Sequence, residues 1–303
     1  MSNVKRRKKE PQVKVSAGLQ TKQTWLPYAL LVPCFAFFFV FVFYPFAKAV
    51  YLSFTLTDMF GKPVKWVGMF NYLRVFKNPD FWNMMKITFT FALMVGIGTF
   101  LVALVFALLS VDQVKGGKIY QVMFSLPMAI ASVPAASMFI FLLSRDGIIN
   151  RLIGVSIDWF GDGKMAIFAI AFVTIWSHVG SSYLYLLVGF RNVPIDLRES
   201  ARLDGAGWWA SVKNILLPIA SPQIFFVVFL NILNSFKAFS FFKLLTGSGV
   251  GGSTDVLIYQ IYKQAFGLNR FETACVYSVF LFIVIFIFTR LQFAFEKRMV
   301  HYQ

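Results

Sequence analysis

Charged residues are scarce in this sequence, and cysteine is almost absent. Only 14% of the 303 residues are charged, whereas 58% are hydrophobic and 38 are phenylalanine. A soluble domain cannot keep so much apolar surface away from water, so the composition excludes a soluble protein and predicts an integral membrane protein. The two cysteines, Cys34 and Cys275, lie in apolar runs and imply neither a disulfide framework nor a metal site.

Acidic residues are few, and their shortage leaves a formal net charge of +16. A strongly basic chain can indicate nucleic-acid binding, but many of these basic residues flank apolar runs, which argues against a nucleic-acid partner. Residues 1–24 carry seven of them and predict a basic, disordered tail. Basic flanks of membrane spans remain in the cytoplasm, so we expect the N-terminus there, close to anionic lipid headgroups.

Six apolar segments reach the roughly 20 residues that a membrane-spanning helix needs. They lack the alternation typical of membrane β-barrel strands, so we expect an all-α transmembrane domain over residues 25–298. An even number of crossings places the C-terminal tail, residues 299–303, in the cytoplasm as well. The expected spans are residues 26–53, 87–110, 119–143, 165–188, 217–236 and 274–293.

Charged residues are missing from the centres of all six expected spans. Proton- and ion-coupled transporters commonly place charges there, so their absence argues against a secondary transporter. His178 is the one histidine in a span, and we interpret it as a packing group. A membrane enzyme would need a convergent acid–base or metal set, which two histidines do not supply.

A nucleotide-binding loop is also absent, because no G-x-x-x-x-G-K-[ST] motif occurs. The glycine-rich stretches at Gly116 and Gly247 lack the strand–helix context of such a loop. If transport is driven by ATP, hydrolysis must therefore take place on a separate subunit. We expect no catalytic residue, cofactor or metal in this chain.

Residues 189–216 form a long charged segment between two apolar runs. Asp196 and Glu199 resemble a capping box, which predicts a short helix that begins at Leu197. Gly205 allows that helix to end in a left-handed turn. A second helix is then expected from Ala206 toward Pro218.

This segment has a recognisable spacing. It resembles the EAA loop of ABC importer permeases, E-A-A-x3-G-x9-I-x-L-P, with serine in place of the middle alanine. Further stretches, among them residues 67–72, 78–82 and 244–262, resemble the carbohydrate-uptake branch, the maltose and glycerol-phosphate permease group, and within it the F-type subunit. The residues of the expected coupling loop are Glu199, Ser200, Ala201, Asp204, Gly205, Ala206, Ile215, Leu217 and Pro218.

The resemblance extends over residues 25–298 and implies a type I importer permease that pairs with a second, homologous permease. Two ATPase subunits, which would hold ATP and Mg²⁺, would dock on the coupling loop from the cytoplasm, and an external solute-binding protein would deliver the substrate. That substrate would be a sugar or oligosaccharide. An anionic polyol such as glycerol phosphate remains an alternative, for which Lys237 and Lys243 could provide attraction, although snorkelling at the interface explains them more simply.

Polar residues inside the spans are the candidates for a substrate path. Asn231, Asn234 and Ser235 share one face of the fifth expected span, and polar residues in the third predict that it packs inside the bundle. The alternative is that these groups join helices by hydrogen bonds, each worth about 0.6 kcal/mol in membranes. The candidate path residues are Trp176, Ser181, Tyr183, Asn231, Asn234 and Ser235, and the polar residues of the third span include Gln121, Ser125, Ser132 and Ser137.

Overall fold

The computed structural model describes residues 26–112, 117–246 and 254–299. The expected N-terminal tail, almost all of the expected C-terminal tail and residues 247–253 of the glycine-rich motif lie outside these ranges. The chain falls into two compact units, Met1–Lys48 and Ala49–Gln303, which we call unit 1 and unit 2. Each unit is described by itself.

Unit 1 is an uncovered apolar helix. It contains α1 (Leu26–Phe38), a π-helical stretch (Phe39–Phe43) and the beginning of α2 (Tyr44–Ser53). Every side chain from residue 28 to residue 48 is exposed within the chain. An isolated apolar helix of this length is stable only where hydrocarbon or protein replaces water, and its bounds agree with the first expected span.

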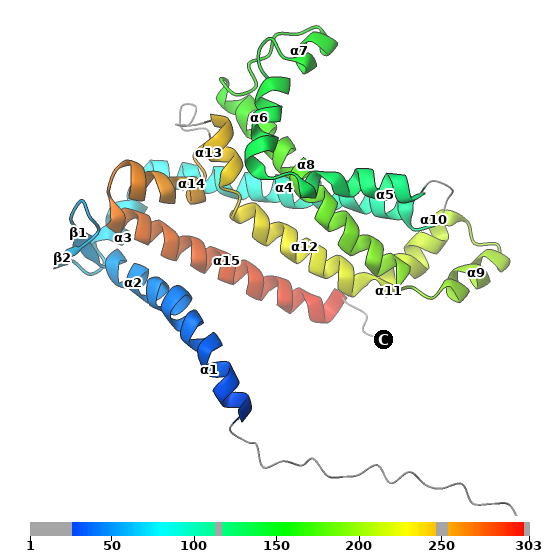
Figure 1. Cartoon of the computed structure of the whole chain (residues 1–303), viewed down its shortest axis with the longest axis horizontal. Coiled ribbons are helices and arrows are strands. Elements are labelled where there is room, and N and C mark those ends of the chain that lie inside the picture. The colour runs from blue at the N-terminus through cyan, green and yellow to red at the C-terminus, as the bar shows by residue number, and fades with distance from the viewer. Residues whose placement is uncertain (1–25, 113–116, 247–253, 300–303) are drawn as a thin grey trace, which may run out of the picture. The chain divides into compact units, whose positions relative to one another are not determined.

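Three long helices form the frame of unit 2, namely α4 (Pro79–Ser110), α8 (Gly163–Arg191) and α15 (Phe271–Met299). Figure 1 shows α4, α8, α12 (Ser221–Phe236) and α15 running alongside one another. Gly98 lets α4 approach α8 closely, because a Cβ atom there would lie 2.7 Å from the Ile175 side chain. The apolar cores between these helices are rich in phenylalanine, as the composition predicts.

Helix starts in the frame follow from the sequence. Asn78 accepts a hydrogen bond from the Asp80 backbone N–H (2.9 Å), and Pro79 occupies the first helical position of α4. Asp162 caps α8 in the same way, through the Lys164 N–H (3.0 Å). Both helices therefore begin earlier than the apolar runs alone predict, at residue 79 rather than 87 and at residue 163 rather than 165.

Two of the six expected spans are not straight helices. The third is α5 (Gly117–Ser125), a 3-10 turn (Leu126–Ala129) and α6 (Ser132–Leu142), bent by 100°. The fifth contains a 74° bend between residues 208–219 and α12. Prolines explain both bends, since Pro127 and Pro222 cannot donate the helical hydrogen bond and their rings disfavour a continuous helix.

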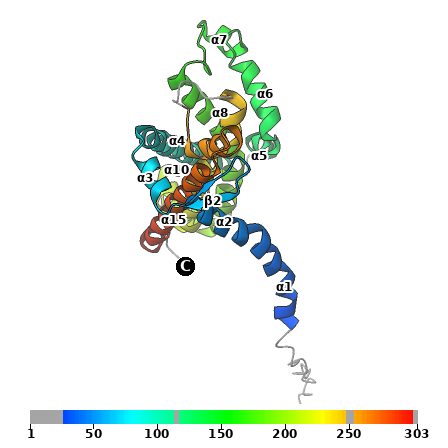
Figure 2. The same cartoon turned by 90° about the vertical axis from the view of Figure 1, so that its left-hand side faces the viewer.

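By length and apolar composition, four helices in the described part of the chain can cross a membrane, or up to six if each bent pair is one span. The expectation that the third span packs inside the bundle holds only in part, since Ala135, Ala136 and Phe139 of α6 lie in the apolar core of unit 2. No residue of α5 is buried, and Ser137 of α6 is exposed. Figure 2 shows α5 and α6 along the edge of unit 2.

The two ends of the frame differ. One end, the α3 end, carries the hairpin β1 (Thr55–Thr57) and β2 (Pro63–Trp66), paired antiparallel, together with α3 (Phe70–Phe76) and α14 (Leu257–Tyr262). The other, the α9 end, carries α9 (Ile195–Leu203), α10 (Trp208–Ser211) and α11 (Leu217–Ile219) (Figure 1). The remaining helices of the described residues are α7 (Ile148–Ile153), α13 (Ser240–Thr246) and two π-helical stretches (Val212–Leu216 and Lys263–Gly267).

Candidate functional site

The expected coupling loop folds as a helical elbow at the α9 end. Its first arm, α9, begins at Ile195, directly after Pro194, and not at Leu197. The expected capping box is wrong, because no side chain caps the helix. Pro194, with ψ of 129°, leads the backbone directly into the helix, and Asp196 remains in the first turn, where a negative charge favours the helix dipole.

The elbow turns at Gly205, as the sequence predicts. Gly205 has a φ of +82°, its N–H bonds to the Arg202 carbonyl (3.1 Å), and the Ala206 N–H bonds to the Ala201 carbonyl (2.9 Å). This pair of bonds is a Schellman motif, with Asp204 as the C-cap residue. The glycine of the motif is therefore required by backbone conformation.

The second arm is anchored in the body of the protein. It begins at Trp208, two residues later than expected, because Gly207 is extended, and it continues through a π-helical stretch (Val212–Leu216) into α11. Ile215 and Leu217 pack against the core that contains Leu186 and Phe190 of α8. Pro218 lies in α11, just before the bend into α12. The I-x-L-P half of the motif is thus structural.

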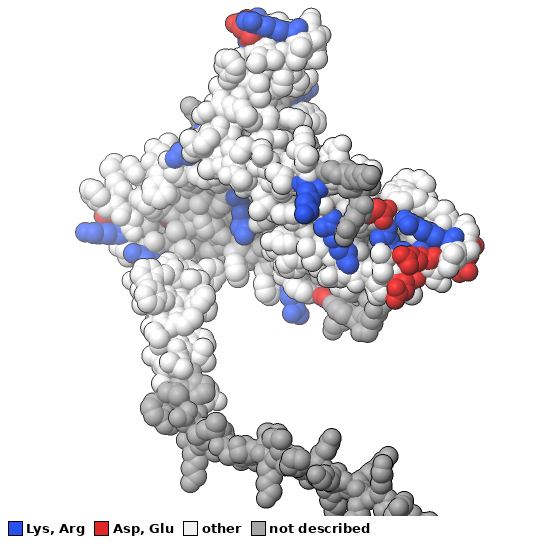
Figure 3. All heavy atoms as spheres, turned by 45° about the vertical axis from the view of Figure 1, so that its right-hand side comes forward, with Lys and Arg blue, Asp and Glu red and all other residues white. Residues whose placement is uncertain are grey.

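The first arm, by contrast, is open to a partner. Glu199 and Ser200 are exposed and Ala201 is half-buried, and within the described residues Glu199 makes no ion pair or side-chain hydrogen bond. Apolar side chains stand beside them, with Leu203 89% and Trp209 73% exposed. Figure 3 shows acidic and basic side chains gathered at this end of unit 2. Exposed apolar and charged groups on one small elbow are typical of a docking surface.

One face of α9 is fixed to α4. Arg198 and Arg202, four residues apart, both contact the Asp112 carboxylate just beyond the end of α4, Arg202 at 3.6 Å. Arg191, at the end of α8, donates to the Ser110 carbonyl (3.2 Å). The sequence interpretation missed these contacts. The sequence did show two arginines at i and i+4, which share a helix face. It gave no indication of their partner, which lies 86 residues from Arg198 in the sequence.

The candidate path residues do not form one site within this chain. Asn231 of α12 accepts a hydrogen bond from Ser182 of α8 (2.7 Å), and Ser235 donates to the Asn231 carbonyl (2.7 Å). All three are buried. This geometry favours the role of a helix-joining group for Asn231, whereas Ser235 bonds within its own helix. Ser182 was not among the path residues.

The other path residues are scattered. Tyr183 is fully buried against Phe124, and its hydroxyl has no hydrogen-bond partner in the described part of the chain. The Ser181 hydroxyl donates within its own helix to the His178 carbonyl (3.0 Å). Trp176 packs edge-on against Phe139, with ring centroids 5.0 Å apart, while Asn234 is half-buried on α12.

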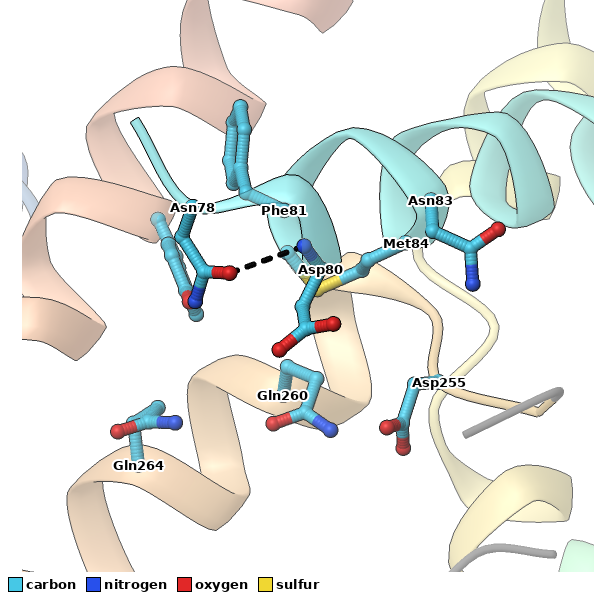
Figure 4. Close-up of a pocket in the computed structure, with 9 residues that line it drawn as sticks. Asn78, Asp80, Phe81, Asn83, Met84, Asp255, Gln260 and Gln264 are labelled. Carbon is cyan, nitrogen blue, oxygen red and sulfur yellow. Dashed lines mark hydrogen bonds between the residues drawn. The ribbon is translucent and has the colours of Figure 1, made fainter. Parts of the chain in front are cut away.

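A polar cavity of about 330 Å³ lies at the α3 end. Asp80, from the start of α4, and Asp255 and Gln260, from the segment around α14, point into the same space (Figure 4). Burial raises the pKa of Tyr259 on α14, and the Asp255 charge raises it further. These residues belong to two motifs that carried the family resemblance, but their meeting depends on tertiary structure.

Comparison with known proteins identifies the fold and the family. The sn-glycerol-3-phosphate transport system permease protein UgpA of Pectobacterium atrosepticum is 30% identical over 289 residues, which cover 93% of this chain and 97% of that protein. UgpA of Yersinia enterocolitica is 32% identical over 287 residues, covering 92% and 97%. A bacterial ABC transporter involved in the import of the acidic polysaccharide alginate shares the fold, with a TM-score of 0.81, 22% identity and coverage of 91% and 96%.

The family model of the binding-protein-dependent transport system inner membrane component matches residues 100–301, which include the whole elbow. The matched residues contain both the exposed elbow and the apolar helices α8, α12 and α15, and the relatives align over more than nine tenths of the chain. The chain therefore belongs to the family of binding-protein-dependent transport system inner membrane components.

Proposed function

We propose that this chain is a non-catalytic, six-span permease subunit of an ABC importer that carries a sugar or related polyol into the cell. Each bent helix pair forms one span, and both termini lie in the cytoplasm. The observation that carries the proposal is the elbow, whose E-S-A-x3-G half is exposed while its I-x-L-P half is packed into the bundle. Such an arrangement can pass the movement of a docked partner to the membrane helices.

The partner at the elbow is an ATPase subunit, with ATP and Mg²⁺ bound there and not on this chain. Glu199 is the charged contact of the elbow, because it is the acidic residue of the E-S-A-x3-G motif and is exposed, with no ion pair among the described residues. Ser200 and Ala201 are small enough to allow close approach of another protein surface. Two ATPases are required, one for this permease and one for its pair.

The second permease covers α5 and α6. These helices are apolar enough to lie in a membrane, yet they leave Gln121 and Ser125 half-buried and Ser137 exposed. Polar groups in hydrocarbon are costly, so they are better placed at a protein interface or along a water-filled path. A substrate path between two permeases also explains why the candidate path residues are not gathered within one chain.

The substrate class is supported by the relatives, whose names specify sn-glycerol 3-phosphate and an acidic polysaccharide. An anionic polyol is therefore the second candidate. Lys243, which could attract such a substrate, is already engaged, since its Nζ donates to the Tyr262 hydroxyl (3.0 Å) and lies 4.4 Å from that ring. Uptake by cells that lack this subunit, measured for neutral oligosaccharides and for sn-glycerol 3-phosphate, separates the two candidates.

The coupling role is tested with Glu199→Lys in the assembled complex in proteoliposomes. We expect loss of binding-protein-stimulated ATP hydrolysis and of uptake, while the chain remains in the membrane, because we expect Glu199 to pair with a basic residue of the ATPase and a lysine would repel it. Asp146→Lys, which reverses an exposed charge in the loop after α6, is the matched control and should leave both activities unchanged. Normal uptake by Glu199→Lys would remove the elbow from the mechanism.

A further inference from the structure

We propose that Asp112 is a positioning residue that clamps α9 to α4, so that α4 moves together with the coupling elbow. The inference rests on the proposed function, since it concerns how the elbow's movement enters the bundle. The chain itself connects α9 to α8 on one side and to α10 on the other. The Asp112 clamp adds a third connection, to a helix that is distant from α9 in the sequence.

The geometry of α9 separates two tasks. Arg198 and Arg202 lie four residues apart and therefore on one face of the helix, where a single carboxylate can contact both. Glu199 is turned by about 100° from Arg198 and by about 60° from Arg202, and it is exposed beside the clamped face. The helix can thus hold α4 with its two arginines and present Glu199 to an ATPase from the flank of that face.

Only the Arg198 side of the clamp is shielded from water. The Arg198 side chain is only 13% exposed, whereas those of Arg202 and Asp112 are 59% and 40% exposed. Isolated surface pairs contribute little, but removing one partner of a shielded pair leaves an uncompensated charge. The Arg191 bond to the Ser110 carbonyl lies at the same end of α4 and reinforces the junction.

A clamp at this position acts on the whole bundle. α4 has 32 residues and extends from the α9 end to Pro79 at the α3 end, packing against α8 and α12 on the way. Asp80, at its far end, lines the polar cavity of the α3 end. A helix is stiff along its axis, so displacement of α9 reaches the opposite end of the protein through α4.

The test compares coupling, not only activity. The complete complex is reconstituted with Asp112→Asn, which keeps the side-chain shape but removes the charge, and with Asp146→Asn as the matched control. We expect Asp112→Asn to retain ATPase association and basal hydrolysis while uptake per ATP hydrolysed falls about five- to tenfold, a typical size for a coupling between sites. The control should keep the wild-type ratio.

A charge swap makes the test specific to the contact. Asp112→Arg alone should lower the uptake-to-ATP ratio further than Asp112→Asn, and Asp112→Arg combined with Arg198→Asp and Arg202→Asp should restore much of it. If a single variant fails to assemble, restoration of assembly by the swap supports the clamp. Lack of restoration would overturn it.

The outcomes also distinguish this inference from the proposed function. A wild-type ratio in Asp112→Asn, together with lost coupling in Glu199→Lys, would refute the clamp and leave the permease role intact. Unchanged coupling in both variants would refute the elbow itself.

Discussion

The two ends of unit 2 both carry family-like motifs, but a key polar side chain is buried and hydrogen-bonded at one end and exposed at the other. At the α3 end Asn71 is fully buried and donates to the carbonyls of Ser53 (3.0 Å) and Thr55 (2.8 Å). At the α9 end Glu199 is exposed and makes no ion pair in the described part of the chain. The amide N–H groups of Asn71 bond inside the chain and are structural, whereas the exposed Glu199 carboxylate is available to another protein.

The same contrast extends to ion pairs. Glu272, at the start of α15, accepts from the Thr57 hydroxyl (2.7 Å) and pairs with Arg74 (3.4 Å), which joins the hairpin, α3 and α15. These contacts hold the α3 end together as one cap. Among the residues that the structure describes, the α9 end has one comparable ion-pair junction, the Asp112 clamp, and it fixes only one face of α9.

The largest stability effect is expected from Asn71→Ala. Loss of both hydrogen bonds leaves two carbonyls without this donor in a buried site, which should lower the free energy of unfolding by roughly 2–4 kcal/mol. The measurement is unfolding of the detergent-solubilised protein. Asn83→Ala, at an exposed position five residues into α4, is the control and should change stability little. Equal stability of the two variants would contradict the structural role of Asn71.

A smaller effect is expected from Gly205→Ala, because an alanine at a φ of +82° costs about 1–2 kcal/mol. The strain should distort the elbow and reduce binding-protein-stimulated ATP hydrolysis, with global unfolding little changed. Gly207→Ala is a close control, since Gly207 is extended and a Cβ atom there meets nothing within 4 Å. If Gly207→Ala were as harmful as Gly205→Ala, the left-handed turn would not be what matters.

The smallest effect is expected at the junction of α8 and α12. Asn231→Ala and Ser182→Ala should each lower stability, and their double mutant should show a coupling energy of about 0.6 kcal/mol, as helix-joining bonds in membranes do. Apparent affinity for the transported substrate should remain unchanged in both. A lowered affinity in Asn231→Ala would instead indicate that Asn231 contacts the transported substrate.

Much of the fold followed from local chemistry. Apolar length indicated helices that are long and apolar enough to cross a membrane. Gly205 predicted the left-handed end of α9, because only backbone without a Cβ atom adopts that conformation easily. The helix starts were less accurate. Asn78 and Asp162 cap α4 and α8 ahead of their apolar runs, and Pro194 replaced the expected capping box.

The elbow and the membrane character of this protein were determined by the sequence itself, since they depend on composition and on residues within a few turns of one another. Only the tertiary structure decided which polar groups were satisfied. Asp112 contacts Arg198, which is 86 residues away in the sequence, and Ser182 donates a hydrogen bond to Asn231, which is 49 residues away. Such pairings depend on how long helices pack, and no local pattern encodes the packing of two distant helices.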